Sequence, residues 1–135
     1  MSKWRRAQLI LSTGKSGLHA LTGPVVAAAI VFSTGQHRIK THGKTPEERL
    51  ELYYKTAIDI RVSSVNPRCV RFYGADWCIR KATDKAIVFL DRRSYIHNQG
   101  MWPWQQEAAD DVAHITRDSL VRDLESCCLG HKRYV

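Results

Sequence analysis

Between Ser12 and Phe32 the chain reads STGKSGLHALTGPVVAAAIVF, which has the composition of a phosphate-binding loop at the start of an enzyme. It holds a Gly-Lys-Ser triplet at 14–16, two further glycines and a continuous apolar run. A P-loop needs a glycine five positions before Gly14, where Leu9 stands, and it opens into a helix, whereas this stretch opens into a strand pattern. The stretch has no carboxylate, no cysteine and one histidine, His19. It is therefore not a P-loop, and by itself it provides no ligand set for a metal.

Carboxylates with the chemistry for a metal site occur elsewhere. Asp91 ends the apolar stretch VFLD, and Glu107, Asp110 and Asp111 stand at the start of the last helical segment. A single acid is more typical of a helix cap, a salt bridge or a solvated strand end than of a metal ligand. Acids in a first helical turn are favoured by the helix dipole. We therefore expect no bound metal, and a site rebuilt from Glu107, Asp110 or Asp111 is the alternative.

The four cysteines do not form a disulfide framework, because the adjacent pair at 127–128 points in different directions from one helix. The stretch CCLGH lacks the second paired cluster of a zinc site. These features favour an intracellular, reducing compartment, while the basic start MSKWRRAQLILS leaves organelle targeting open. The longest apolar run is too short to span a bilayer, so we expect no membrane partner.

Positive charge is concentrated near the start of the chain. The net charge is +8, from 21 Lys and Arg against 13 Asp and Glu, and residues 1–46 contain no acid. A basic surface favours polyanions because neutralising phosphates releases counterions. The cations expected to line one nucleic-acid-binding face are Lys15, Arg38, Lys40, Lys44 and Lys132; the plain alternative is a solvated basic surface. We expect three histidines to be ordinary polar residues: His19, His42 and His114. We expect three tryptophans to lie in the core, Trp77, Trp102 and Trp104; stacking of one of them on a base is the alternative.

The elements that position these residues alternate between strand and helix. Residues 8–12, 25–32 and 60–65 read as strands, and AIVFLD as a short buried strand ending in an acid. In TPEERLELYYKTAI, Thr45 and Glu48 form a capping box around Pro46, which predicts a helix. Further helices are expected over about 70–81 and from about 106, the last capped by Gly130. The pattern predicts one α/β domain over residues 1–135.

From LTGPVVAAAIV onward the chain resembles the type 2 ribonuclease H (ribonuclease HII) family, whose signature is a strand ending in D-E-x-G-R-G followed by P-L-A-G-P-V-V-A-A-A. KTHGKTPEERLELY is similar to the family's D-S-K-K-L-T-P-K-K-R-E-E-L-Y, and VFLD resembles the strand that ends in its third catalytic Asp. QEAADDVAHITRDSLVRDLE and GHKRYV are similar to its last two motifs, I-A-A-A-S-I-L-A-K-V-T-R-D-x-x-M-x-x-L and H-K-G-Y. The resemblance implies a ribonuclease H-like mixed sheet flanked by helices, compact and lacking the family's usual C-terminal extension.

The departures from the family concern its chemistry. The family hydrolyses the RNA strand of an RNA–DNA duplex with two divalent cations that four carboxylates hold. Set on the family's motifs, those four positions are Gly14, Lys15, Asp91 and Gly100 in this chain. The resemblance thus leaves Asp91 as a vestigial ligand, with no catalytic residue, no metal site and no cofactor. We also expect the Lys15 ammonium to replace the metal and pair with Asp91, because an unpaired anion in a concave pocket is costly.

The recognition residues implied by the resemblance are Gly17 and His19, in place of the family's Gly-Arg-Gly, Lys40 in its Asp-Ser-Lys loop, and Tyr134, in place of the tyrosine at the RNA–DNA junction. The function expected is an inactive ribonuclease HII-like protein that binds RNA, DNA or an RNA–DNA hybrid. The alternatives are an architectural subunit of a ribonucleoprotein or other protein assembly, and a diverged active nuclease that uses magnesium or manganese.

Overall fold

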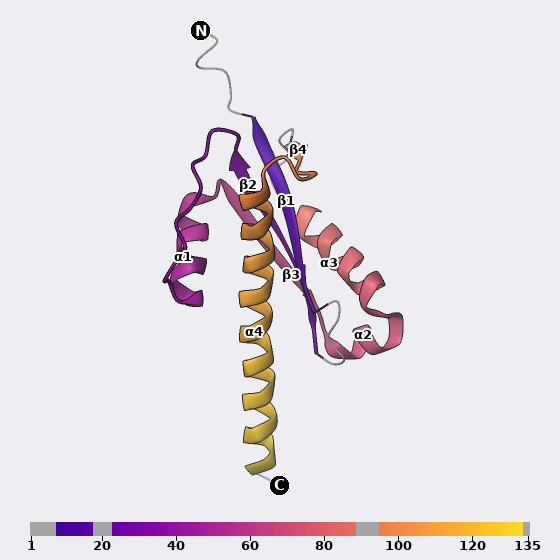
Figure 1. The fold of residues 1–135 in the computed structure, drawn as a ribbon. Helices are drawn as coiled ribbons and strands as arrows, with labels where there is room; N and C mark the ends of the chain where they lie inside the picture. The colour runs from indigo at the N-terminus through magenta and orange to yellow at the C-terminus, as the bar shows by residue number, and fades with distance from the viewer. Residues whose placement is uncertain (1–7, 18–22, 89–94, 134–135) are drawn as a thin grey trace.

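The computed structural model describes residues 8–17, 23–88 and 95–133, with side chains as far as residue 123. Its strands are β1 (Leu9–Ser16), β2 (Val25–Ser33), β3 (Asp59–Val65) and β4 (Tyr95–His97). Its helices are α1 (Pro46–Thr56), α2 (Pro67–Tyr73), α3 (Ala75–Val88) and α4 (Pro103–Arg133). One mixed sheet thus lies between helices, as Figure 1 shows, with α1 and α4 on one face and α2 and α3 on the other. The expected α/β class is confirmed.

The sheet has the strand order β3-β2-β1-β4. β1, β2 and β3 are joined antiparallel, and β4 runs parallel to β1, with Leu9 opposite Tyr95 and Leu11 opposite His97. β4 reaches only the first residues of β1, so the edge of β1 beyond Leu11 is not covered by a strand among the described residues. Beyond Leu11, side chains of α4 bond to the backbone of β1, Gln106 to the Thr13 carbonyl and Asp110 to the Lys15 amide.

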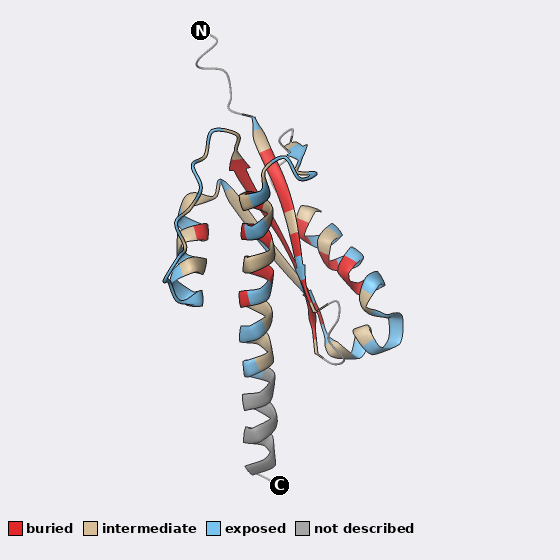
Figure 2. Ribbon diagram, viewed as in Figure 1, coloured by how far each residue is buried: buried red, intermediate tan, exposed pale blue. Residues whose placement is uncertain are grey.

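The core forms because β2 is apolar on both sides. Alternate residues of a strand point to opposite faces, and Val26, Ala28, Ile30 and Phe32 pack toward α1 and α4. The intervening residues Val25, Ala27, Ala29 and Val31 pack toward α3. All eight are fully or almost fully buried, and Figure 2 shows the burial concentrated along the middle strands and the sheet-facing sides of α3 and α4. The continuous apolar run is thus a strand covered on both faces.

The helix α1 begins as its sequence predicts. The Thr45 hydroxyl accepts from the Glu48 amide, and the Glu48 carboxylate accepts from the Thr45 amide. The hydrogen bond that the Thr45 amide donates to the Glu48 carboxylate holds the pKa of Glu48 below its ordinary value. On the inner side of α1, Tyr53 is buried against α4. The capping box therefore fixes where the segment 34–45 ends and the helix begins.

Three expectations about elements are wrong. Ala86, Ile87 and Val88 belong to α3 rather than to a strand, because Cys78, Ala82 and Ala86 repeat every four residues and keep the same face of the helix on the sheet. Tyr95–His97, for which the sequence predicts no strand, pairs with β1 as β4. Gly130 does not cap α4, since the helix continues to Arg133.

Candidate nucleic-acid interface

Gly14 lies where the resemblance places the first catalytic carboxylate, and α4 lies directly on it. A Cβ atom at Gly14 would overlap the carbonyl group of Ala109 and the amide nitrogen of Asp110. Around this contact, the Gln106 side-chain amide donates to the Thr13 carbonyl at 2.7 Å, and the Lys15 amide donates to Asp110 Oδ1 at 3.3 Å. Only glycine fits at this position, because the backbone of α4 fills the space that the side chain of a metal-binding carboxylate would need.

Lys15 points away from that helix. Residues paired directly across two strands point to the same face of a sheet. Gly14 pairs with Ala28, which packs toward α4, whereas Lys15 pairs with Ala27, which packs toward α3. The exposed Lys15 side chain therefore lies on the α3 face of the sheet.

The glycines that flank the loop after β1 are held by Arg117 of α4. Gly17 and Gly23 have φ angles of 99° and 103°, which favour glycine. A Cβ at Gly17 would lie 2.8 Å from Arg117 Nε, and one at Gly23 would lie 2.7 Å from Arg117 Nη2. Arg117 Nε also donates to the Pro24 carbonyl at 2.9 Å. Gly17 is thus a conformational residue of this loop, and Arg117 joins the two ends of the loop to α4.

Glu107, Asp110 and Asp111, near the start of α4, are each held by a neighbouring segment. Asp111 accepts from Arg49 Nε at 2.8 Å, from Arg49 Nη2 at 3.2 Å and from the Tyr53 hydroxyl at 2.7 Å. The hydrogen bond to Asp111 raises the pKa of Arg49, and burial together with the same carboxylate raises the pKa of Tyr53. Glu107 pairs with Arg38 at 3.5 Å, and Asp110 accepts from the Lys15 amide. Within the described part of the chain, no three metal-ligating side chains gather into a site.

The segment between β2 and α1 carries the exposed basic residues. Arg38, Lys40 and Lys44 are exposed, as are His37 and His42. No acid occurs between Ser33 and Thr45. The Arg38–Glu107 pair and the hydrogen bond from Arg49 to the Lys44 carbonyl tie this segment, which we call the basic segment (residues 36–44), to α4 and α1. Arg38, Lys40 and Lys44 therefore lie together on one side of the molecule, whereas Lys15 lies on the other face of the sheet.

The remaining site residues are placed as follows. Gly100 stands in an exposed turn with a φ of 104°, and a Cβ there would meet nothing within 4 Å. His19, Asp91 and Tyr134 lie outside the described residues, as does the side chain of Lys132, whose backbone belongs to α4. The pairing of Lys15 with Asp91 thus stays a prediction.

Two residues near β1 were not singled out from the sequence. Asn98 directly follows β4; its amide side chain donates to the Ser12 hydroxyl at 2.9 Å and to the Trp102 carbonyl at 2.8 Å. Arg117 is the arginine of ITRD, in the stretch similar to the family's T-R-D motif, and that match is the sequence signal for its role. Among the tryptophans, Trp104 packs on Phe32 with ring centroids 4.8 Å apart, whereas Trp77 is 39% exposed and is not a core residue.

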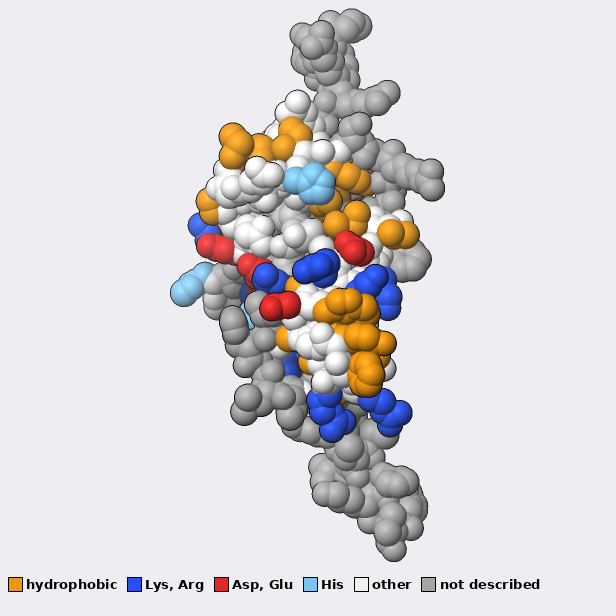
Figure 3. All heavy atoms as spheres, turned by 90° about the vertical axis from the view of Figure 1, so that its right-hand side faces the viewer, with side chains coloured by type: hydrophobic (Ala, Val, Ile, Leu, Met, Phe, Trp, Pro, Cys, Tyr) orange, Lys and Arg blue, Asp and Glu red, His pale blue; other side chains and the backbone are white. Residues whose placement is uncertain are grey.

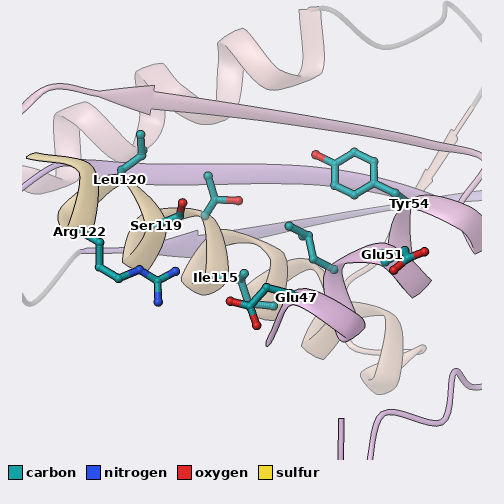
Figure 4. A pocket seen from close by; sticks show the side chains of 9 residues that line it. Glu47, Glu51, Tyr54, Ile115, Ser119, Leu120 and Arg122 are labelled. Carbon is teal, nitrogen blue, oxygen red and sulfur yellow. The ribbon is translucent and has the colours of Figure 1, made fainter. Parts of the chain in front are cut away.

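A second feature is a groove between α1 and α4, with a volume of about 460 Å³. Figure 4 shows side chains from both helices around it, including Tyr54, Ile115 and Leu120. Its walls are mostly apolar, and its rim carries Glu47 and Glu51 from α1 opposite Arg122 from α4. A groove with acids on its rim does not suit a polyanion, so the basic segment is the better candidate interface.

Comparison with known proteins supports the fold. No family model matches the chain, and no curated protein matches it in sequence. Among solved structures, the crystal structure of the ribonuclease H2 from Pyrococcus horikoshii OT3 is similar, with a TM-score of 0.59 and 16% sequence identity over 88% of this chain and 76% of that chain. The chain has a ribonuclease H-like fold. At this identity the likeness concerns the fold alone. In addition, no described helix has the length and apolar character needed to cross a membrane.

Proposed function

We propose that this protein binds nucleic acid through phosphate contacts made by the basic segment and does not hydrolyse it. The observation that carries the proposal is the exposure of Arg38, Lys40 and Lys44 on a segment without acids, in a protein with a net charge of +8. Lysine and arginine neutralise phosphates and release their counterions, which provides affinity without reading bases. The resemblance to ribonuclease HII makes RNA, DNA or an RNA–DNA hybrid the ligand.

The acid nearest to the basic segment does not prevent this binding. Glu107 pairs with Arg38 at 3.5 Å, but the side chain of Glu107 is 70% exposed and that of Arg38 is 72% exposed. An ion pair so exposed contributes little net stability, because water and salt screen it. A phosphate can therefore replace Glu107 as the partner of Arg38 at little cost.

The absence of hydrolysis is proposed from the geometry around Gly14. The two-cation chemistry of the family needs carboxylates that converge on one place. At Gly14 the backbone of α4 excludes any side chain, and Asp111 is fully engaged by Arg49 and Tyr53. The residues present do not fit a pair of divalent cations, so we propose that the protein functions without a metal cofactor. Its cysteines Cys69 and Cys78 are unpaired thiols, which suits the reducing compartment proposed for it.

The test is equilibrium binding of a fluorescent RNA–DNA hybrid at several salt concentrations. If Arg38, Lys40 and Lys44 each neutralise one phosphate, the binding constant falls roughly 40-fold between 50 and 200 mM salt. The double variant Lys40→Glu/Lys44→Glu should bind every sequence more weakly, because phosphate contacts carry no sequence information.

A matched control separates local contacts from net charge. Lys55→Glu/Arg61→Glu makes the same change in total charge at exposed residues of α1 and β3 that pair with Glu51 and Asp59. It should weaken binding far less than the Lys40/Lys44 variant. Binding that both variants weaken equally would refute the assignment to the basic segment. Binding that is indifferent to salt or to the Lys40/Lys44 reversals would favour an architectural role in a protein assembly. Magnesium- or manganese-dependent cleavage of the hybrid would show an active nuclease instead.

A further inference from the structure

Three aromatic side chains are exposed side by side on α2 and α3. Phe72 is 81% exposed, Tyr73 53% and Trp77 39%. The rings of Phe72 and Tyr73 meet edge to face with centroids 4.9 Å apart, and those of Tyr73 and Trp77 stack at 4.3 Å with an angle of 21°. We call these three residues the aromatic patch. Figure 3 shows hydrophobic side chains gathered on this face, with lysine and arginine side chains around them.

The core does not require these rings. The residues of α2 that pack toward the sheet are Cys69 and Val70, and α3 contributes Cys78, Ile79 and Ala82. None of the three rings belongs to that buried cluster, and they lie on either side of Gly74, which ends α2 with a φ of 89°. A contiguous exposed group of large apolar side chains in a soluble domain marks an interaction surface.

The charge around the patch indicates what it binds. Residues 67–88 contain five cations, Arg68, Arg71, Arg80, Lys81 and Lys85, and two acids, Asp76 and Asp84. None of the five cations forms a salt bridge with a residue that the structure describes. The Lys81 ammonium lies 5.4 Å from the centre of the Trp77 ring, and the exposed Lys15 lies on the same face of the sheet.

We propose that the aromatic patch binds unpaired nucleotides of single-stranded nucleic acid. Bases stack on exposed aromatic rings whatever their sequence, and neighbouring Lys and Arg residues contact the phosphates. Free cations around the rings fit a polyanion, whereas a patch built for a neutral or basic protein surface would need acids or an uncharged border. This surface lies across the sheet from the basic segment, so it is a second site, beyond the duplex contacts proposed above.

The experiment compares a fluorescent oligothymidylate of about 12 nucleotides with a blunt RNA–DNA hybrid. Phe72→Ala removes the most exposed ring and is expected to raise the Kd for the oligothymidylate about 5-fold or more, the loss of one stacked base. It should leave the Kd for the hybrid within about 2-fold. The oligothymidylate should also quench tryptophan fluorescence, and Trp77→Phe should remove most of that quenching.

The controls make each result decisive. Tyr54→Ala removes another exposed tyrosine, 54% exposed on α1, and should leave both Kd values unchanged. Lys81→Ala should weaken oligothymidylate binding, and Lys55→Ala should not. If the oligothymidylate binds equally well to Phe72→Ala and wild type, the patch is not its site, although duplex binding by the basic segment can still hold. If Phe72→Ala instead changes the sedimentation of the protein, the patch is an interface between copies, and the assignment to nucleotides is wrong.

Discussion

Replacing Gly14 by alanine adds one carbon atom at the point where α4 crosses β1. That carbon would overlap the backbone of Ala109 and Asp110, whereas carbon atoms in contact normally lie about 3.5–4.0 Å apart. The helix would have to move away by on the order of 1 Å. Such a movement would also stretch the 2.7 Å hydrogen bond from Gln106 to the Thr13 carbonyl.

Overpacking a core costs typically 1–3 kcal/mol, and the upper end, about 3 kcal/mol, applies because backbone cannot rotate aside as a side chain can. With an unfolding entropy of about 2.1 cal/mol/K per residue, the melting temperature of this 135-residue chain should fall by roughly 10 °C. Thermal unfolding followed by circular dichroism measures this. Gly35→Ala is the matched control, because a Cβ there meets nothing within 4 Å, and its melting temperature should stay within about 2 °C of wild type.

The same contact decides whether a catalytic acid can be restored. Gly14→Asp should be at least as destabilised as Gly14→Ala and should gain no metal-dependent cleavage of a hybrid. A Gly14→Ala protein that melts within about 2 °C of wild type would refute the reasoning, because it would show that α4 does not occupy the space at Gly14. The pocket would then be open to a carboxylate, and the argument against a metal site would fail.

Three further predictions concern the acids of α4 and the chemistry. Asp111→Asn should lower the free energy of unfolding by about 2 kcal/mol, because it removes the charged acceptor of hydrogen bonds from Arg49 and Tyr53, which are partly buried. Glu107→Gln on the same helix should change the melting temperature little, and thermal melts of both variants test this. Burial and Asp111 raise the pKa of Tyr53 in the folded protein, whereas an unfolded tyrosine ionises near pH 10. The contribution of Tyr53 to stability is therefore complete below about pH 10 and declines as the pH rises above it. In thermal melts at alkaline pH, the melting temperature of Tyr53→Phe should fall less with rising pH than that of wild type. Added EDTA, magnesium or manganese should leave the melting temperature unchanged, and a shift by any of them would indicate a bound ion.

The features predicted correctly from the sequence are those with a strong local cause. Thr45, Pro46 and Glu48 determine the start of α1 through bonds within one turn of helix. The continuous apolar run from Val25 to Phe32 identifies a strand buried on both faces. Such signals need no knowledge of what lies across the molecule.

The features that were missed depend on distant contacts. A short apolar run such as AIVFL is compatible with helix or strand, and the packing of Ala82 and Ala86 on the sheet decides for helix. Trp77 is expected in the core from the sequence, but it is 39% exposed, because its neighbours Cys78 and Ile79 take the inner positions of α3. That α4 would fill the space at Gly14 follows from a contact between residues 95 positions apart, for which the sequence has no signal besides the glycine itself.

The packing at Gly14 and the position of the cations have a joint consequence for how this fold binds a ligand. Where α4 lies against β1, Asp111 bonds to Arg49 and Tyr53, Asp110 accepts from the Lys15 amide, and the backbone of α4 occupies the space at Gly14. The exposed cations stand outside that space, on the basic segment and around the aromatic patch. A nucleic acid is therefore expected to bind across exposed surface and not in a cleft. Contacts of that kind act on phosphates and stacked bases, and they place no scissile bond beside a reactive group.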